Sequence, residues 1–266
     1  MKLTTFFLLS CFLFSFCKIG QAQFAQVRLP NEIVLNEINE AKLNGISFQV
    51  IKRKGWPAKF FKSTAFFISK NCVLTSAHNI KEVKSHPMYK MGIYPSRRGD
   101  KYPYGEVVFY VDYPRHFKAI KRSFFNLRWR SRPHDMALVY LPDSNITKNE
   151  LIKSIDYLPI FENPKSLQKG DTIYCAGYPG TGVYSGQVVM TMIKSTIKKI
   201  HKYHFSHELE TLPGHSGSPI MVKRNGQFYV IGINSIHHYG TFLNEERQLL
   251  IKEWIKELEE KITSSI

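Results

Sequence analysis

Short apolar runs separated by polar turns make up most of this chain. Residues 63–69 and 72–75 are two such runs, and the two residues between them suit a hairpin turn. Further runs of strand length cover residues 106–111, 136–141, 171–176, 188–197, 209–211, 219–222 and 228–233. Because no long helical pattern separates these runs, the sequence predicts an all-β barrel or sandwich.

Two segments have a helical pattern instead. In residues 31–44, acidic residues alternate with apolar ones, which predicts a short helix. This helix would belong either to a pro-segment over residues 23–45 or to the first element of the mature protein. Near the C-terminus, Asn244 can cap a second helix, which we predict over residues 245–262. Its apolar residues recur at helical spacing and are Leu250, Trp254, Ile255, Leu258 and Ile262.

Residues 1–22 have the pattern of a secretory signal peptide. Lys2 gives a positive start, residues 3–16 are almost entirely apolar, and small residues precede a predicted cut before Gln23. The apolar run is too short to cross a bilayer as a helix, and no later segment is apolar enough to do so. We therefore expect a secreted or periplasmic protein with no membrane span.

The cysteines fit the same interpretation. Cys11 and Cys17 lie in the predicted signal, where a lipoprotein cut before either of them is an alternative. Only Cys72 and Cys175 remain in the mature chain, and two cysteines are too few for a disulfide framework. Each lies in a different strand-like run, so we expect two buried free thiols in preference to one bridge.

The chain is strongly basic, with a formal net charge of +16 over 266 residues. Such a charge attracts acidic polymers and acidic substrates, and salt weakens the attraction. In residues 115–132, basic and aromatic residues alternate and no acid is present. This composition occurs in surfaces that bind nucleic acid or anionic glycans, and also in exposed loops that raise solubility. We favour the exposed loop.

Three polar signals stand out against the apolar runs. Ser216 lies in a glycine-rich turn, His78 ends one apolar run and Asp135 precedes another. A serine nucleophile needs a base with the pKa of histidine, and that histidine needs a carboxylate to orient it. Gly214 and Ser216 offer backbone N–H groups for the oxyanion that forms. The combination predicts acyl transfer by His78, Asp135 and Ser216, with no cofactor and no metal.

On these residues the chain resembles the chymotrypsin-like (trypsin-like) serine peptidases, in particular their bacterial branch of glutamyl endopeptidases. The matching segments are residues 74–78, 134–138, 211–219 and 231–235. The order His, Asp, Ser distinguishes this family from the subtilisins and the α/β-hydrolases. Asn79 favours the bacterial branch, because animal trypsin-like enzymes usually carry a cysteine at this point.

The resemblance implies two six-stranded antiparallel β-barrels with the active site in the cleft between them. We place the N-terminal barrel at residues 46–155, the C-terminal barrel at residues 156–243 and the closing helix at residues 244–266. The resemblance also implies a monomeric serine endopeptidase that acts on proteins or peptides.

Two other functions remain open on the same fold. One is a non-catalytic binding module that uses the basic surface, although such a role does not need a complete triad. The other is an ester-cleaving hydrolase, since neither fold nor motif names the bond that is cut.

The resemblance also implies residues that bind the substrate side chain before the cut bond. Thr211 matches a threonine of the glutamyl enzymes, which favours an acidic substrate residue. Those enzymes carry a histidine where this chain has Asn234, whose amide can still donate a hydrogen bond to a carboxylate. His237 and His238 are alternative partners for that carboxylate.

Two further residues complete the expected substrate site. Glu210 stands where trypsin-like enzymes carry the acid that selects basic residues. Ser235 matches a serine that supports the triad acid and lies beside the substrate backbone. We rank acidic or uncharged polar residues before the cut bond above basic ones.

His201, His204 and His207 recur at every third residue, a spacing that raises the question of a metal site. On a strand, His201 and His207 would share a face that His204 does not. We therefore expect a solvated loop and no metal.

Overall fold

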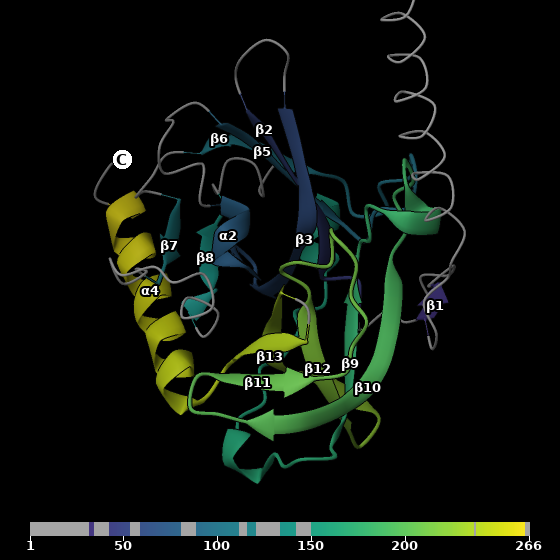
Figure 1. Cartoon of the computed structure of the whole chain (residues 1–266). Helices are drawn as coiled ribbons and strands as arrows, with labels where there is room; N and C mark the ends of the chain where they lie inside the picture. The colour runs from purple at the N-terminus through teal and green to yellow at the C-terminus, as the bar shows by residue number, and fades with distance from the viewer. Residues whose placement is uncertain are drawn as a thin grey trace, which may run out of the picture.

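The computed structural model of this chain describes residues 32–34, 43–53, 59–80, 89–111, 116–120, 134–141, 150–236 and 238–263. Its strands form two antiparallel sheets, and a long helix follows the last strand (Figure 1). The predicted all-β fold with a C-terminal helix is confirmed.

The N-terminal sheet has seven strands in the order β6-β5-β2-β3-β4-β8-β7. They are β2 (Ile46–Arg53), β3 (Lys59–Ser69), β4 (Cys72–Thr75), β5 (Tyr89–Pro95), β6 (Val107–Val111), β7 (Phe117–Ala119) and β8 (Ala137–Tyr140). β3 and β4 form the predicted hairpin. Over the described ranges, no pairing joins the outer strands β6 and β7, so this sheet is a curled half-barrel where the sequence predicted a closed one. β7 has only three residues, which leaves little backbone to pair.

The C-terminal sheet closes into a barrel of six strands, as predicted. Its strands are β9 (Thr172–Gly177), β10 (Thr191–Ile200), β11 (His204–His207), β12 (Pro219–Arg224), β13 (Gln227–Ile236) and β14 (Tyr239–Phe242). Pairing of β9 with β10 completes the ring. β1 (Glu32–Val34) adds a seventh strand to the sheet at β10.

The strands that carry the site are buried on both faces. Val73 of β4 packs in the core of the N-terminal sheet, whereas its neighbour Leu74 packs in a core shared by both sheets. In β8, Ala137 likewise packs in the core of the N-terminal sheet and Leu138 in the shared core. Successive side chains of a strand point to opposite faces. This explains why both runs are continuously apolar.

Helices are few among the described residues. They are α2 (Ala77–Ile80), η5 (Glu150–Ser154), η6 (Pro164–Ser166), η7 (Gly182–Tyr184) and α4 (Glu245–Thr263). Asn244 caps α4, because its Oδ1 accepts the Arg247 N–H at 3.0 Å. Trp254 and Leu258 bury one side of α4 in the shared core, and the helix lies beside β7 and β8 (Figure 1).

Two predicted elements differ from the structure. The helix predicted over residues 31–44 is wrong at Glu32–Val34, which form strand β1, because β10 offers an unpaired edge there. Residues 31 and 35–42 lie outside the described residues. Residues 209–211 form no strand and belong to a connecting segment. The predicted signal peptide also lies outside the described part of the chain.

Cys72 and Cys175 are buried free thiols, as expected. Cys72 lies in β4 and Cys175 in β9. Burial raises the pKa of the Cys72 thiol to about 11 and that of the Cys175 thiol to about 12. Neither thiol is therefore a reactive thiolate at neutral pH.

The three spaced histidines lie on a hairpin and not along one strand. The rings of His201 and His204 stack where β10 turns into β11, with their centroids 4.3 Å apart. His207 is buried at the end of β11. The expectation of a solvated loop is thus wrong for His207. Within the described ranges, no group of three or more His, Cys, Asp or Glu residues is placed to hold a metal ion.

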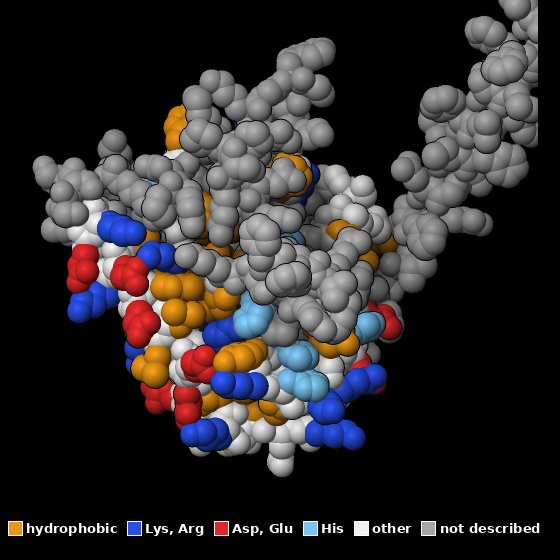
Figure 2. Space-filling model, turned by 60° about the vertical axis from the view of Figure 1, so that its left-hand side comes forward, with side chains coloured by type: hydrophobic (Ala, Val, Ile, Leu, Met, Phe, Trp, Pro, Cys, Tyr) orange, Lys and Arg blue, Asp and Glu red, His pale blue; other side chains and the backbone are white. Residues whose placement is uncertain are grey.

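The described surface mixes charges of both signs. On the face shown in Figure 2, Lys and Arg side chains lie beside Asp and Glu side chains. Ion pairs join Lys118 to Glu257 and Lys202 to Glu246. Most of the basic segment 115–132 lies outside the described residues, which include only 116–120 of it. No helix in the described part of the chain is long and apolar enough to span a membrane.

Candidate active site

The pairing of β4 with β8 brings His78 next to Asp135. Thr75 pairs with Ala137 at the end of this antiparallel ladder. Residues that follow β4 therefore lie beside residues that precede β8. His78 follows β4 in the short helix α2, and Asp135 precedes β8.

Asp135 binds His78 through both of its carboxylate oxygens. Oδ1 accepts the backbone N–H of His78 at 2.9 Å, and Oδ2 lies 2.6 Å from the imidazole Nδ1. The Ser235 hydroxyl donates a further hydrogen bond to Oδ2. A carboxylate only accepts, so the proton of the neutral imidazole belongs on Nδ1 and Nε2 is left as the proton acceptor.

The environment of Asp135 keeps its carboxylate ionised. Its side chain is only 2% exposed, and burial by itself raises the pKa. The hydrogen bonds and charge of His78, together with the hydrogen bond from Ser235, outweigh burial and lower the pKa of Asp135 below its ordinary value. An ionised carboxylate here stabilises positive charge on His78.

Ser216 lies in the turn that precedes β12. Its carbonyl oxygen accepts hydrogen bonds from the Thr64 N–H and from the side-chain amide of Asn79, both at 3.0 Å. Its hydroxyl donates to the Ser235 carbonyl oxygen at 3.4 Å, and no hydrogen bond of the described residues joins it to His78. Ser216 and His78 nevertheless line the same two pockets. Rotation about the Cα–Cβ bond of Ser216 is the movement that redirects its hydroxyl.

The direction of the Gly214 N–H is fixed by a hydrogen bond to the other end of the same peptide group. The Pro213 carbonyl of that peptide accepts the Gly180 N–H at 2.8 Å. Because C=O and N–H point in opposite directions across a trans peptide, this bond fixes the direction of the Gly214 N–H. The Gly214 N–H itself has no acceptor among the described residues. Gly214 has a φ of 104°, and a side chain there would collide with the Tyr178 carbonyl oxygen.

The Ser216 N–H is oriented in the same way. The His215 carbonyl accepts hydrogen bonds from the Asn234 side-chain amide and from the Ser218 N–H, both at 3.0 Å. The Ser216 N–H points away from them and has no acceptor among the described residues. Two fixed N–H donors without acceptors therefore lie at the Ser216 turn, which suits the stabilisation of an oxyanion.

His215 connects this turn to its surroundings. Its side chain is fully buried, with Nδ1 accepting the Leu212 N–H at 3.1 Å and Nε2 lying 3.0 Å from the Thr191 hydroxyl. Its own N–H donates to the Leu212 carbonyl at 3.0 Å. Burial lowers the pKa of His215 to about 4, so the ring is neutral at physiological pH and Nδ1 remains an acceptor.

A pocket of about 200 Å³ adjoins Ser216, and we call it the Ser216 pocket. It is lined by His78, Thr211, Leu212, Pro213, Ser216, Asn234, Ser235 and Ile236. The expected substrate-binding residues Thr211, Asn234 and Ser235 are thus brought together beside the expected nucleophile.

Asn234 differs from its expected role as a donor to the substrate. Its amide nitrogen already donates to the His215 carbonyl. Its Oδ1 is buried and has no hydrogen-bond partner among the described residues. The group that Asn234 leaves unpaired is therefore an acceptor.

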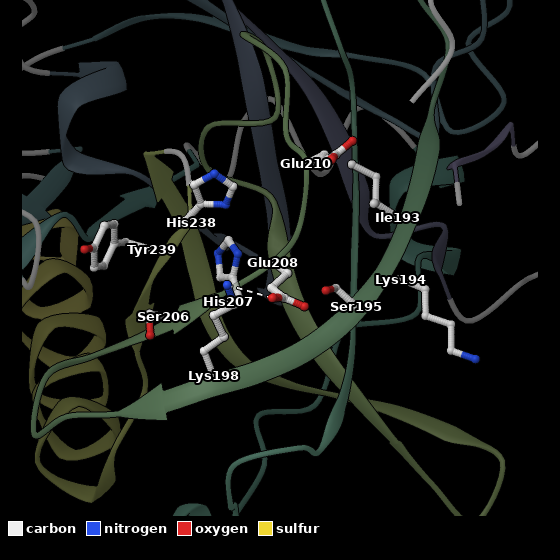
Figure 3. Close-up of a pocket in the computed structure, with 10 residues that line it drawn as sticks. All are labelled: Ile193, Lys194, Ser195, Lys198, Ser206, His207, Glu208, Glu210, His238 and Tyr239. Atoms are coloured by element: carbon white, nitrogen blue, oxygen red, sulfur yellow. Dashed lines mark ion pairs between the residues drawn. The ribbon is translucent and has the colours of Figure 1, made fainter. Parts of the chain in front are cut away.

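Glu210 lines a different cavity of about 600 Å³, the Glu210 pocket (Figure 3). It is lined by Ile193, Lys194, Ser195, Lys198, Ser206, His207, Glu208, Glu210, His238 and Tyr239. An ion pair of 2.6 Å joins Lys198 to Glu208 in it (Figure 3). The structure thus separates Glu210 and His238 from the Ser216 pocket, and His237 lies outside the described residues.

A third cavity of about 400 Å³, the Phe60 pocket, lies on the Gly214 side of Ser216. It is lined by Ile51, Phe60, Phe61, Lys62, Ser63, His78, Asn79, Pro213, Gly214 and Ser216. Phe60 is 56% exposed and Phe61 is 38% exposed. The site therefore has an apolar surface in addition to the Ser216 pocket.

The sequence did not point to the residues that support Ser216 from the N-terminal sheet. Thr64 donates its N–H to the Ser216 carbonyl and its hydroxyl to the Gly214 carbonyl, the latter at 2.8 Å. Asn79 donates to Ser216 and to Thr75. Thr64 and Asn79 are common polar residues, and no sequence motif assigns either of them a role in supporting Ser216. The one local signal is that Asn79 directly follows the catalytic candidate His78 in the chain.

Comparison with known proteins supports this description of the fold. Residues 63–233 match the trypsin-like peptidase domain family. No curated protein sequence matches the chain. A solved Glu endopeptidase in complex with MPD superposes with a TM-score of 0.64 at 16% identity, covering 85% of this chain and 97% of its own. The protease Anisep from Arthrobacter nicotinovorans superposes with a TM-score of 0.57 at 15% identity, covering 76% of this chain and 91% of its own.

At these identities the two solved structures show the fold alone, and they confirm the predicted chymotrypsin-like architecture. The family match covers more than half of the chain and includes the segments that carry His78, Asp135 and Ser216. The chain belongs to the trypsin-like peptidase family.

Proposed function

We propose that this protein is a secreted serine endopeptidase that hydrolyses peptide bonds through an acyl-enzyme formed on Ser216. The observation that carries the proposal is the double hydrogen bond between His78 and Asp135 beside the pockets that Ser216 lines. That arrangement leaves Nε2 of His78 as the ring nitrogen that can accept the proton of the Ser216 hydroxyl.

The first step is acylation. Ser216 Oγ attacks the carbonyl carbon of the substrate while Nε2 of His78 accepts the hydroxyl proton. The N–H groups of Gly214 and Ser216 stabilise the oxyanion. His78 then gives its proton to the leaving amine as the carbon–nitrogen bond breaks, and Ser216 is left as an ester.

The second step returns the enzyme to its starting state. A water molecule attacks the ester carbonyl as His78 accepts one of its protons. The carbon–Oγ bond breaks, and His78 returns that proton to Ser216 Oγ. Through both steps Asp135 stabilises the protonated imidazole and remains ionised.

Secretion is supported by the signal pattern of residues 1–22. The acidic preference expected from the resemblance has support from Thr211, which lines the Ser216 pocket. It has none from Asn234, whose amide donor is already used by the His215 carbonyl.

Cleavage of a diverse peptide library separates this proposal from a binding module on the same fold. We expect the wild type to turn over library members, and Ser216→Ala and His78→Ala to lose turnover by roughly a million-fold. Circular dichroism and thermal unfolding control for folding. No turnover of any member by correctly folded wild type would contradict the proposal.

A further inference from the structure

We propose that the Ser216 pocket selects a neutral amide side chain, that of glutamine or asparagine, in the residue before the cut bond, and that Asn234 is the group that recognises it. The inference rests on the proposed peptidase function, because it names the substrate class of that same site. It departs from the acidic residue that the resemblance implies.

The orientation of Asn234 is fixed by the protein. Its amide nitrogen lies 3.0 Å from the His215 carbonyl oxygen. The opposite orientation of the amide would place Oδ1 against that oxygen, and two acceptors do not bond. Oδ1 therefore remains the unpaired group, in a side chain that is 2% exposed and lines the pocket. A buried acceptor without a partner is stabilised by a ligand that brings an N–H group.

Thr211 supplies the complementary group. Its side chain lines the same pocket at 6% exposure, and its hydroxyl has no hydrogen-bond partner among the described residues. A hydroxyl can donate as well as accept. A primary amide carries both an N–H₂ donor and a carbonyl acceptor, so it matches Asn234 Oδ1 and the Thr211 hydroxyl together.

The lining of the Ser216 pocket fits the alternative substrate side chains less well. No Lys, Arg, Asp or Glu is among the described residues that line the Ser216 pocket. Glu210 and His238, two further candidates from the sequence, line the Glu210 pocket instead (Figure 3). A glutamate carboxylate offers only acceptors to Asn234 Oδ1, and a lysine would be buried without a counter-charge. A leucine leaves both polar groups unpaired.

Asn234 also holds the His215 carbonyl and so the direction of the Ser216 N–H. Its substitution is therefore expected to lower kcat on every substrate. A change in selectivity must be read from the ratio of kcat/KM between substrates, which a general loss of activity does not alter. Thr211 makes no such contact, which makes it the second test position.

The experiment uses four fluorogenic peptides that are identical except for glutamine, glutamate, lysine or leucine before the cut bond. Wild type, Asn234→Leu and Thr211→Val are assayed on each, and active enzyme is counted by fluorophosphonate labelling of Ser216. We expect wild type to favour glutamine over each other peptide by at least about 10-fold in kcat/KM. Asn234→Leu is expected to reduce the glutamine-to-leucine ratio by about 10-fold, and Thr211→Val to reduce it by a smaller factor.

Each outcome decides a separate point. Cleavage of the glutamate peptide as fast as the glutamine peptide overturns the selectivity, even if Ser216 is labelled. An unchanged ratio in Thr211→Val and in folded Asn234→Leu overturns the role of these residues. If Asn234→Leu does not fold, Thr211→Val alone decides. Folded wild type whose Ser216 is not labelled overturns the peptidase function itself.

Discussion

The backbone N–H and the imidazole Nδ1 of His78 contact the two oxygens of one carboxylate, that of Asp135. One contact fixes where the His78 backbone lies, and the other fixes how its ring is turned and which nitrogen carries the proton. The imidazole of His78 is therefore positioned in the free protein, which would lower the cost of organising it if His78 is the base that we propose.

Replacing Asp135 by asparagine tests what this pairing does. The asparagine side chain would offer an N–H₂ group or a neutral carbonyl in place of the carboxylate, so His78 loses both its fixed tautomer and the charge that stabilises its protonated form. We expect Asp135→Asn to lower kcat on the order of 10⁴-fold with a folded protein. Peptide turnover by the purified variant measures this, and a loss smaller than about 10-fold would show that Asp135 has no such role.

Ser235→Ala removes one hydrogen bond to Asp135 and leaves both contacts with His78 in place. We expect a loss of about 10-fold in kcat, because a hydrogen bond to a charged group is typically worth about 1.5–3 kcal/mol. The pKa of Asp135 is expected to rise, since this bond lowers it. The value of kcat measures the first effect, and a profile of kcat/KM against pH, which reports groups of the free enzyme, measures the second. The Ser235 carbonyl that accepts the Ser216 hydroxyl is kept, so an unchanged rate and profile would contradict the assignment.

The buried His215 makes stability depend on pH. Its pKa in the folded protein, about 4, is below the value of about 6.5 in an unfolded chain. Between these values the unfolded chain binds more protons, so the stability from this group is complete above about pH 6.5 and falls as pH decreases toward about 4. We expect His215→Asn to weaken this fall by about 1 kcal/mol per pH unit.

Urea unfolding of wild type and His215→Asn across the range from about pH 4 to about pH 9 measures the difference. Above about pH 7 neither protein has a neutral-to-charged change at this position, so their difference in unfolding free energy should be constant there. Parallel curves over the whole range would contradict the account.

Alanine substitutions at two glycines with similar backbone angles distinguish the cost of backbone strain from the cost of a steric collision. Gly217 has a φ of 87° and Gly226 a φ of 78°. A Cβ on Gly217 would collide with the Thr64 carbonyl oxygen and the Thr75 hydroxyl, whereas a Cβ on Gly226 meets no described atom. We expect Gly226→Ala to cost about 1 kcal/mol and Gly217→Ala several times more, with loss of activity. Equal costs in denaturant unfolding would contradict close packing at Gly217.

The catalytic candidates could be predicted from the sequence because each adjoins a recognisable strand. His78 follows β4, Asp135 precedes β8 and Ser216 precedes β12, so local patterns locate all three. The hairpin of β3 and β4 and the final helix could be predicted for the same reason, since turn residues and helical spacing are local signals.

The side-chain pocket could not be predicted in this way. Glu210 and Thr211 are adjacent in the chain, yet they line different cavities, which depends on how the connecting segment folds. Whether Asn234 presents a donor or an acceptor depends on the His215 carbonyl, which lies beside it only in the folded protein. Strand β1 likewise depends on the edge of β10, so its own sequence did not indicate it.

Covalent labelling tests most directly whether Ser216 is a nucleophile activated by His78. Folded wild type is treated with a fluorophosphonate and its tryptic peptides are analysed by mass spectrometry, beside Ser216→Ala and His78→Ala. We expect one adduct, on Ser216, that is absent in Ser216→Ala and forms far more slowly in His78→Ala. An unlabelled Ser216, or a label of equal rate in His78→Ala, would contradict the proposed activation.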